Sequence, residues 1–274
     1  MTTTTPTTQS GKRPTGRTTR STSVSRLKAL GTAEWLQFRR NKTLLFMATI
    51  FPVGIPLVLF GIGGRGAMEA ANTFDIFVLY TLLFVQFYTV LSMVTTRRDE
   101  RVLKRLRTGE ARDWEILGAI CIPGALLTAV FSIVIIPILM LMGAPTPVNL
   151  ISIVLAVILG LILVSALAFL TSAFTRNAEA AQLTSLPVFT IAMLGLGTLR
   201  PVFGDGLLAE IISYTPFAMI SDLVQLGWAG ATFPDAMADA APLDFTGVLD
   251  ASVQPLLIVL VWIILALVAM RQTM

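Results

Sequence analysis

Long apolar segments alternate with shorter polar ones from about residue 43 to residue 270. The hydrocarbon core of a bilayer is about 30 Å thick, so a helix rising 1.5 Å per residue needs roughly 20 residues to cross it. Six segments have about this length and no charged residue in their interior: 43–62, 75–96, 116–142, 148–175, 180–199 and 253–270. Asp75 stands at the edge of the second segment. The pattern predicts an all-α polytopic membrane protein with six transmembrane helices and no ionisable side chain buried within a span.

The residues before the first span show two further patterns. Residues 1–25 are rich in Thr and Ser, with scattered Arg and no apolar stretch, which predicts a disordered tail. Residues 26–274 then form the transmembrane domain. Within it, Leu27, Leu30 and Phe38 fall near one helical face and Trp35 stands where an aromatic ring marks the headgroup level. This arrangement predicts a short interfacial helix that leads into the first span.

Residues 200–252, between the fifth and sixth spans, are too long for a simple turn. Phe217, Ile220 and Val224 fall on one helical face, whereas Asp222 and Gln225 fall on the other. An amphipathic pattern of this kind predicts a short re-entrant helix that lies in, or dips into, the outer leaflet.

The composition excludes several classes of function. The chain is 55% hydrophobic and 13% charged, whereas soluble domains carry about 25% charged residues, which argues against a soluble enzyme. The absence of His excludes a Ser-His-Asp triad and a His-ligated zinc ion. The single Cys121 excludes an intramolecular disulfide. The chain also lacks a GxxxxGK[ST] phosphate loop, and its GxGxxG match at 61–66 follows an apolar helix instead of a strand. We therefore expect neither a catalytic site, nor a metal site, nor a cofactor in this chain.

The charged residues divide sharply between the two sides of the predicted topology. All but two of the 20 Lys and Arg residues lie in the N-terminal arm, the loop after the second span, or just after the fourth and sixth spans. Only Arg65 and Arg200 fall on the other side, together with nine acidic residues. The positive-inside rule therefore predicts that both termini are cytoplasmic.

The loop after the second span, residues 97–115, is the most informative segment. It is strongly charged, yet Val102, Leu103 and Leu106 form an apolar stripe at helical spacing. A helix of this kind can dock on a partner protein or anchor the chain on lipid. Residues 98–108 read RDERVLKRLRT, which resembles the R-E-x-G-T-L-x-x-L-R-x-T signature of type-2 ATP-binding-cassette (ABC) exporter permeases of the daunorubicin-resistance type. Arg101-Val102 replaces the Gly-Thr pair of the signature.

Three further segments resemble the same family in the same order: EILG at 115–118, AFTRNAEAAQ at 173–182 and YTPF at 214–217. The resemblance implies a half-size transmembrane subunit in a bacterial-type cytoplasmic membrane. A second permease protomer, identical or related, and two separate ABC ATPase subunits, which bind ATP and Mg, would complete the exporter. No nucleic acid is expected as a partner. The residues that would couple this chain to the ATPase are Arg98, Glu100, Arg101, Leu103, Arg105 and Leu106.

The resemblance also implies that the second and fifth spans line a central pathway. The candidate lining residues are Phe84, Gln86, Phe87, Tyr88, Phe189 and Met193. Aromatic side chains in membrane helices also face lipid or pack between helices, so this role is a hypothesis. The expected absence of charged residues within the spans argues against an ion-coupled carrier and for an apolar or amphipathic substrate. The similarity of the 97–108 segment to the daunorubicin-resistance type implies small, drug-like molecules. A lipid-linked saccharide exporter of the same family and a membrane scaffold without transport activity are the alternatives.

Overall fold

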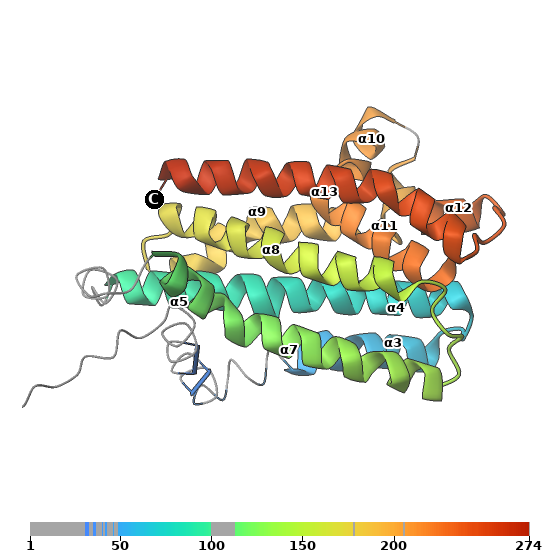
Figure 1. The fold of residues 1–274 in the computed structure, drawn as a ribbon, viewed down its shortest axis with the longest axis horizontal. Coiled ribbons are helices and arrows are strands. Elements are labelled where there is room, and N and C mark those ends of the chain that lie inside the picture. Colours follow the sequence, from blue (N-terminus) through green and yellow to red (C-terminus); the bar gives the residue numbers. More distant parts are fainter. Residues whose placement is uncertain are drawn as a thin grey trace, which may run out of the picture.

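The computed structural model describes residues 31–32, 35–36, 40, 42, 46, 49–99, 113–177, 179–204 and 206–273. Within these residues the regular structure is entirely helical (Figure 1), which confirms the predicted all-α polytopic fold. The elements are η1 (Ile50–Gly54), α3 (Ile55–Ile62), α4 (Ala67–Tyr80), η2 (Thr81–Phe87), α5 (Tyr88–Asp99), α7 (Asp113–Leu141), α8 (Leu150–Phe174), α9 (Ala180–Leu194), η3 (Arg200–Phe203), α10 (Leu207–Ser213), α11 (Pro216–Ala229), α12 (Phe233–Met237) and α13 (Phe245–Thr273).

Four described helices are long and apolar enough to cross a membrane: Ala67–Arg97, Glu115–Leu141, Leu150–Phe174 and Phe245–Gln272. They correspond to the predicted second, third, fourth and sixth spans. The bent pair α10 and α11, with 70° between its members, would make a fifth if it were counted as one broken span. The predicted first and fifth spans contain shorter apolar helices, Ile50–Ile62 and Ala180–Leu194. The described residues therefore contain four or five spans by length. Part of the predicted first span lies outside the described residues, so the six-span count stays a prediction.

Two helix starts differ from the predicted boundaries. The second span begins at Ala67 instead of residue 75, and the last helix begins at Phe245 instead of residue 253. Asp75 consequently lies inside a long helix, where its side chain is only 3% exposed. The prediction that no span buries an ionisable side chain was therefore wrong. Asp75 can be buried because hydrogen-bond donors from another helix meet its carboxylate, as described below.

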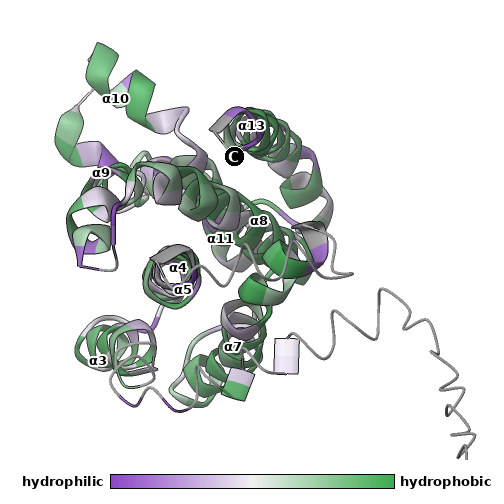
Figure 2. Cartoon of the chain, turned by 90° about the vertical axis from the view of Figure 1, so that its left-hand side faces the viewer, coloured by the Kyte–Doolittle hydropathy of each residue, from purple (hydrophilic) through white to green (hydrophobic). Residues whose placement is uncertain are grey.

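The long helices run roughly parallel to the longest axis, and α11 lies in the middle of the bundle (Figures 1 and 2). It contacts α4, α8, α9 and α13. Thr215 caps its first turn by accepting a hydrogen bond from the Ala218 backbone N–H. Gly230 ends it with a φ of 72°, a left-handed conformation that suits glycine.

All 14 residues of α11 are buried in the chain. The amphipathic pattern correctly predicted a helix between the fifth and sixth spans, and its sharp bend against α10 fits a re-entrant segment. Protein covers the polar face of this helix as well as the apolar one. The polar side chains of α11 meet polar groups of α4 and of the 195–200 turn instead of solvent.

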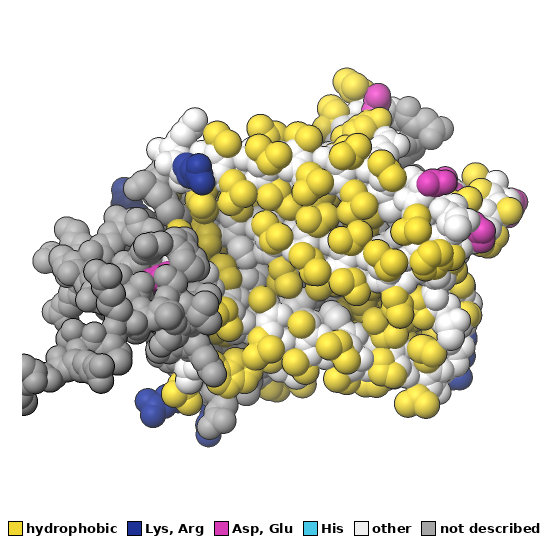
Figure 3. Space-filling view, in the orientation of Figure 1, with side chains coloured by type: hydrophobic (Ala, Val, Ile, Leu, Met, Phe, Trp, Pro, Cys, Tyr) yellow, Lys and Arg dark blue, Asp and Glu magenta, His cyan; other side chains and the backbone are white. Residues whose placement is uncertain are grey.

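The surface of the bundle fits a membrane environment. Hydrophobic side chains cover most of the face visible in Figure 3, between two ends that carry most of its charged residues. Lys and Arg lie mainly at the end that carries the C-terminus, whereas acidic residues gather at the opposite end near α12. This separation agrees with the charge asymmetry of the sequence, and cytoplasmic termini remain the prediction that follows from it.

Candidate functional site

An aromatic cluster forms where η1, η2 and α9 meet, and Phe84 of η2 is its centre. The Phe84 ring centroid lies 5.2 Å from that of Phe189, 5.7 Å from that of Tyr80 and 5.9 Å from that of Phe51. The contacts with Phe189 and Tyr80 are edge-to-face, an arrangement that the charge distribution of aromatic rings favours. Phe87 reaches the same cluster, with its ring centroid 5.9 Å from that of Phe189.

The structure therefore brings together three of the six predicted pathway residues, Phe84, Phe87 and Phe189. Tyr88 and Met193 are half-buried, and Met193 packs at the margin of the hydrophobic core. Phe87 is fully buried, so in the single chain it supports the cluster from behind.

Two members of the cluster were missed by the sequence analysis. Tyr80 lies four residues before Phe84, so the helical repeat places the two on one face, and this signal could have identified it. Phe51 comes from a different helix and is 37% exposed. No spacing within the second span could have revealed it.

Gln86, the remaining predicted pathway residue, lies elsewhere. Its side-chain amide donates hydrogen bonds to the Ser165 hydroxyl at 2.7 Å and to the Cys121 carbonyl at 3.4 Å. These partners belong to α8 and α7, and Gln86 is only 1% exposed. Gln86 thus faces protein, as expected for an amide at membrane depth, and it joins three helices instead of facing the aromatic cluster.

A buried polar network lies nearer the end of the bundle opposite the C-terminus. The Ser221 hydroxyl donates to the Asp75 carboxylate at 2.5 Å, and the Gln225 side-chain amide donates to the same carboxylate at 3.3 Å. Gln225 also donates to Asn72, and the Gly197 backbone N–H donates to Ser221. These contacts connect α11 to α4 and to the turn after α9.

An ion pair extends this network. The guanidinium of Arg200, in η3, pairs with the carboxylate of Asp222, in α11, through two hydrogen bonds. Each side chain is only 10% exposed. A buried pair of this kind requires both partners, because either charge alone would be left without solvation. Among the described residues, no three His, Cys, Asp or Glu side chains converge as metal ligands.

The predicted coupling residues lie almost entirely outside the described part of the chain. Arg98 falls in the last turn of α5, whereas Glu100, Arg101, Leu103, Arg105 and Leu106 belong to the segment between α5 and α7. Their role stays a prediction. The segment does join the ends of two long helices, so a force applied to it would reach both.

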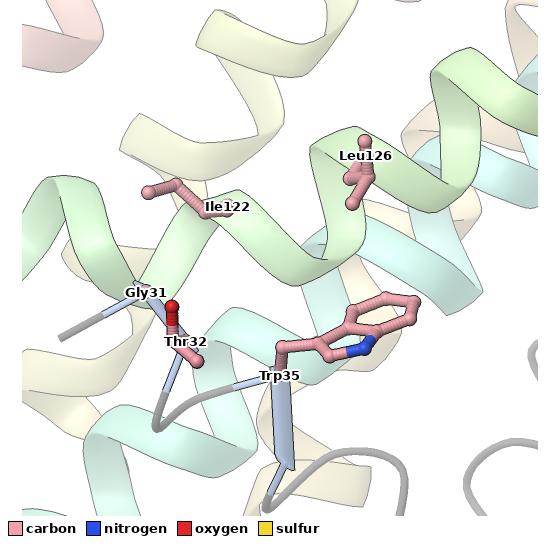
Figure 4. Close-up of a pocket in the computed structure, with 5 residues that line it drawn as sticks. All are labelled: Gly31, Thr32, Trp35, Ile122 and Leu126. Atoms are coloured by element: carbon pink, nitrogen blue, oxygen red, sulfur yellow. The ribbon is translucent and has the colours of Figure 1, made fainter. Parts of the chain in front are cut away.

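Three described residues of the N-terminal arm, Gly31, Thr32 and Trp35, lie beside α7. Thr32 and Trp35 face Ile122 and Leu126 of α7 across a cavity of about 280 Å³ (Figure 4). Gly31 is so close to α7 that an added Cβ would lie 2.8 Å from the Ile122 side chain. Residues 31–32 and 35–36 are helical, which agrees with the predicted helix at these positions.

A comparison with protein-family models matches residues 25–204 to the ABC-2 type transporter family. The match covers more than half of the chain and includes every helix from η1 to η3, whereas α10–α13 lie beyond it. No curated protein matched the chain. Because the family model matches more than half of the chain, the chain belongs to the ABC-2 type transporter family and is a permease subunit of such a transporter.

Proposed function

We propose that this permease subunit exports small amphipathic, drug-like molecules, driven by ATP that two separate ABC ATPase subunits hydrolyse. A second permease protomer, identical or related, would complete the passage. The observation that carries the proposal is the aromatic cluster around Phe84, which three helices build on the surface of a single chain. A cluster in that place would face a second copy or a passage between copies.

The chemistry of the cluster favours flat or partly apolar substrates. Phe51, Phe84 and Phe189 offer ring faces and edges for stacking, and Tyr80 adds one hydroxyl that can form a hydrogen bond. No charged side chain takes part in the ring contacts of the described cluster. A substrate with an isolated strong charge would lose its hydration there without compensation.

The sequence argued against an ion-coupled carrier because no charged residue was expected within the spans. Buried Asp75 weakens that argument, because an intramembrane carboxylate is typical of such carriers. The family assignment now supports an ATP-driven transporter in its place. The carboxylate of Asp75 is also occupied by Ser221 and Gln225. This arrangement fits a structural tie between helices.

The test is reconstitution with the ATPase. The chain would be co-expressed with a soluble ATPase that carries a GxxxxGK[ST] loop and is encoded beside it, and substrate-stimulated ATP hydrolysis would be measured in nanodiscs. Phe84→Ala and Phe189→Ala should each weaken apparent substrate affinity roughly two- to tenfold, because one aromatic contact contributes about 0.5–1.5 kcal/mol. Ile133→Ala, at a 72% exposed position on α7, is the control and should change nothing.

A second variant tests the coupling segment. Replacing Glu100, Leu103 and Leu106 together should abolish ATP-driven transport while membrane insertion stays intact. If that variant still transports, the assignment of these residues as the docking site for the ATPase is wrong. Transport by the chain alone in liposomes, without any ATPase, would contradict the proposed function as a whole.

A further inference from the structure

The longest helix in the described part of the chain changes its winding in the middle. α4, η2 and α5 follow one another without a break from Ala67 to Asp99, and the central part, Thr81–Phe87, is π-helical. The Tyr88 backbone N–H accordingly donates to the Leu83 carbonyl, five residues back instead of four. π-helical turns are rare and are frequently found at functional sites. Here the turn lies between the polar network at Asp75 and the segment that leads to the predicted coupling residues.

Neighbouring helices fit closely around this wider turn. An added Cβ on Gly124 of α7 would lie 2.9 Å from the Val85 carbonyl oxygen, and one on Gly160 of α8 would lie 2.6 Å from a Leu82 methyl carbon. Both glycines therefore leave room that any other residue would fill. A second π-helical segment, η1, faces η2 through the contact between Phe51 and Phe84.

The turn also leaves polar atoms unsatisfied. The side-chain oxygens of Gln86 and Thr89 are buried and have no hydrogen-bond partner in the described part of the structure. Burying such atoms without partners is costly. The present winding therefore includes the cost of these two unsatisfied oxygens.

The sequence of α5 is compatible with two registers. If the π turn closed into an α-helix, α5 would rotate by about 100° relative to α4 and move by about 1.5 Å, and each position would then be taken by the preceding residue. The buried set, now Thr89, Val90, Leu91, Val94 and Thr95, would become Tyr88, Thr89, Val90, Met93 and Val94. The second set is as apolar as the first, and neither contains a charged residue.

We propose that η2 is a register switch, in which the π turn closes and reopens as the ATPase pulls on the segment after α5. Closing moves Phe87, whose ring centroid now lies 5.9 Å from that of Phe189, to the position now occupied by Tyr88, and so changes the aromatic cluster. The outer part of the helix stays in place, because Asp75 is tied to α11 through Ser221 and Gln225. The inference rests on the proposed function for its driving force.

Spin labelling tests the switch directly. In a Cys121→Ala background, a single cysteine would replace Leu91 (buried), Met93 (half-buried) or Ile76 of α4 (half-buried) and carry a nitroxide. Its mobility would be measured by electron paramagnetic resonance in nanodiscs with the ATPase bound, first at rest and then with ATP and vanadate. The label at position 91 should become more mobile and the label at 93 less mobile, whereas the label at 76 stays unchanged. Changes in the same direction at 91 and 93, or no change in a complex that transports, would overturn the proposal.

Deletion of Val85 provides the matched variant. Removing one residue lets the turn close while α5 keeps its present register. The resting spectra at 91 and 93 should therefore match those of the parent and no longer respond to vanadate. ATP hydrolysis should persist while transport is lost. A deletion variant that still transports would overturn the switch, whatever its spectra. If gel filtration shows that the ATPase does not bind the parent chain, the proposed function is overturned instead. The switch would then also lack its driving force.

Discussion

Removing one partner of the Arg200–Asp222 ion pair should destabilise the protein far more than removing both. Both side chains are 10% exposed, and the Nε atom of Arg200 has no hydrogen-bond partner among the described residues. Asp222→Ala would therefore leave a buried guanidinium with no opposite charge in contact. Breaking a buried pair in this way costs about 3–5 kcal/mol. Replacing both residues by apolar ones of similar size, Arg200→Met with Asp222→Leu, should recover most of that loss, since such exchanges are often neutral.

The assay is unfolding in mixed detergent micelles, followed by tryptophan fluorescence. Trp228 of α11 is fully buried, and its ring centroid lies 5.3 Å from that of Phe74, so its emission should report the loss of α11 packing. The exposed Asp250→Ala is the control for loss of an acidic side chain and should change stability by no more than about 0.5 kcal/mol. The reasoning fails if Asp222→Ala is as mild as this control, or if the double variant is as unstable as the single one.

Three further predictions concern local structure. Asn149→Ala should cost about 1–2 kcal/mol because it removes the side chain that caps α8, whereas Asn149→Asp retains the cap and should cost less in the same unfolding assay. Gly227→Ala should cost about 1–3 kcal/mol, since its Cβ would lie 2.7 Å from an α8 side chain; Gly206→Ala, which meets no atom within 4 Å, is the control. The Gly247 backbone N–H holds the pKa of Asp244 below its ordinary value of 3.8. The ionised Asp244 carboxylate therefore stabilises the fold fully above pH 3.8, and this stabilisation is lost as the pH falls through the lower folded-state pKa. The difference in melting temperature between the parent and Asp244→Ala should accordingly shrink in acid.

The sequence predicted the long helices well because length and apolarity are local properties. The prediction failed where a polar residue lies inside a helix and is stabilised by hydrogen bonds from a distant part of the chain. Asp75 was read as the edge of a span, although its carboxylate is met by two side chains of α11, about 150 residues further along the chain. The helical repeat of α11 likewise showed which residues share a face. It could not show that the face with Asp222 would be covered by protein.

The candidate site was predicted in part for the same reason. Phe84 and Phe87 stand close together in the sequence, and the family resemblance paired their span with that of Phe189. Gln86 lies only two residues from Phe84, which is about half a helical turn, so it points to the opposite side of the helix and contacts α7 and α8. The helical repeat could therefore have excluded Gln86 from the cluster.

The end of the bundle opposite the C-terminus is held together by polar contacts between helices. There, Ser152 pairs with Ser252, Asn149 donates to the Phe245 carbonyl, and Asp75 accepts hydrogen bonds from Ser221 and Gln225. Directional hydrogen bonds hold helices in one register, whereas apolar surfaces can exchange one set of contacts for another of similar size. The tie at Asp75 therefore fixes the outer part of the helix, so movement that begins at the predicted coupling segment would end at η2.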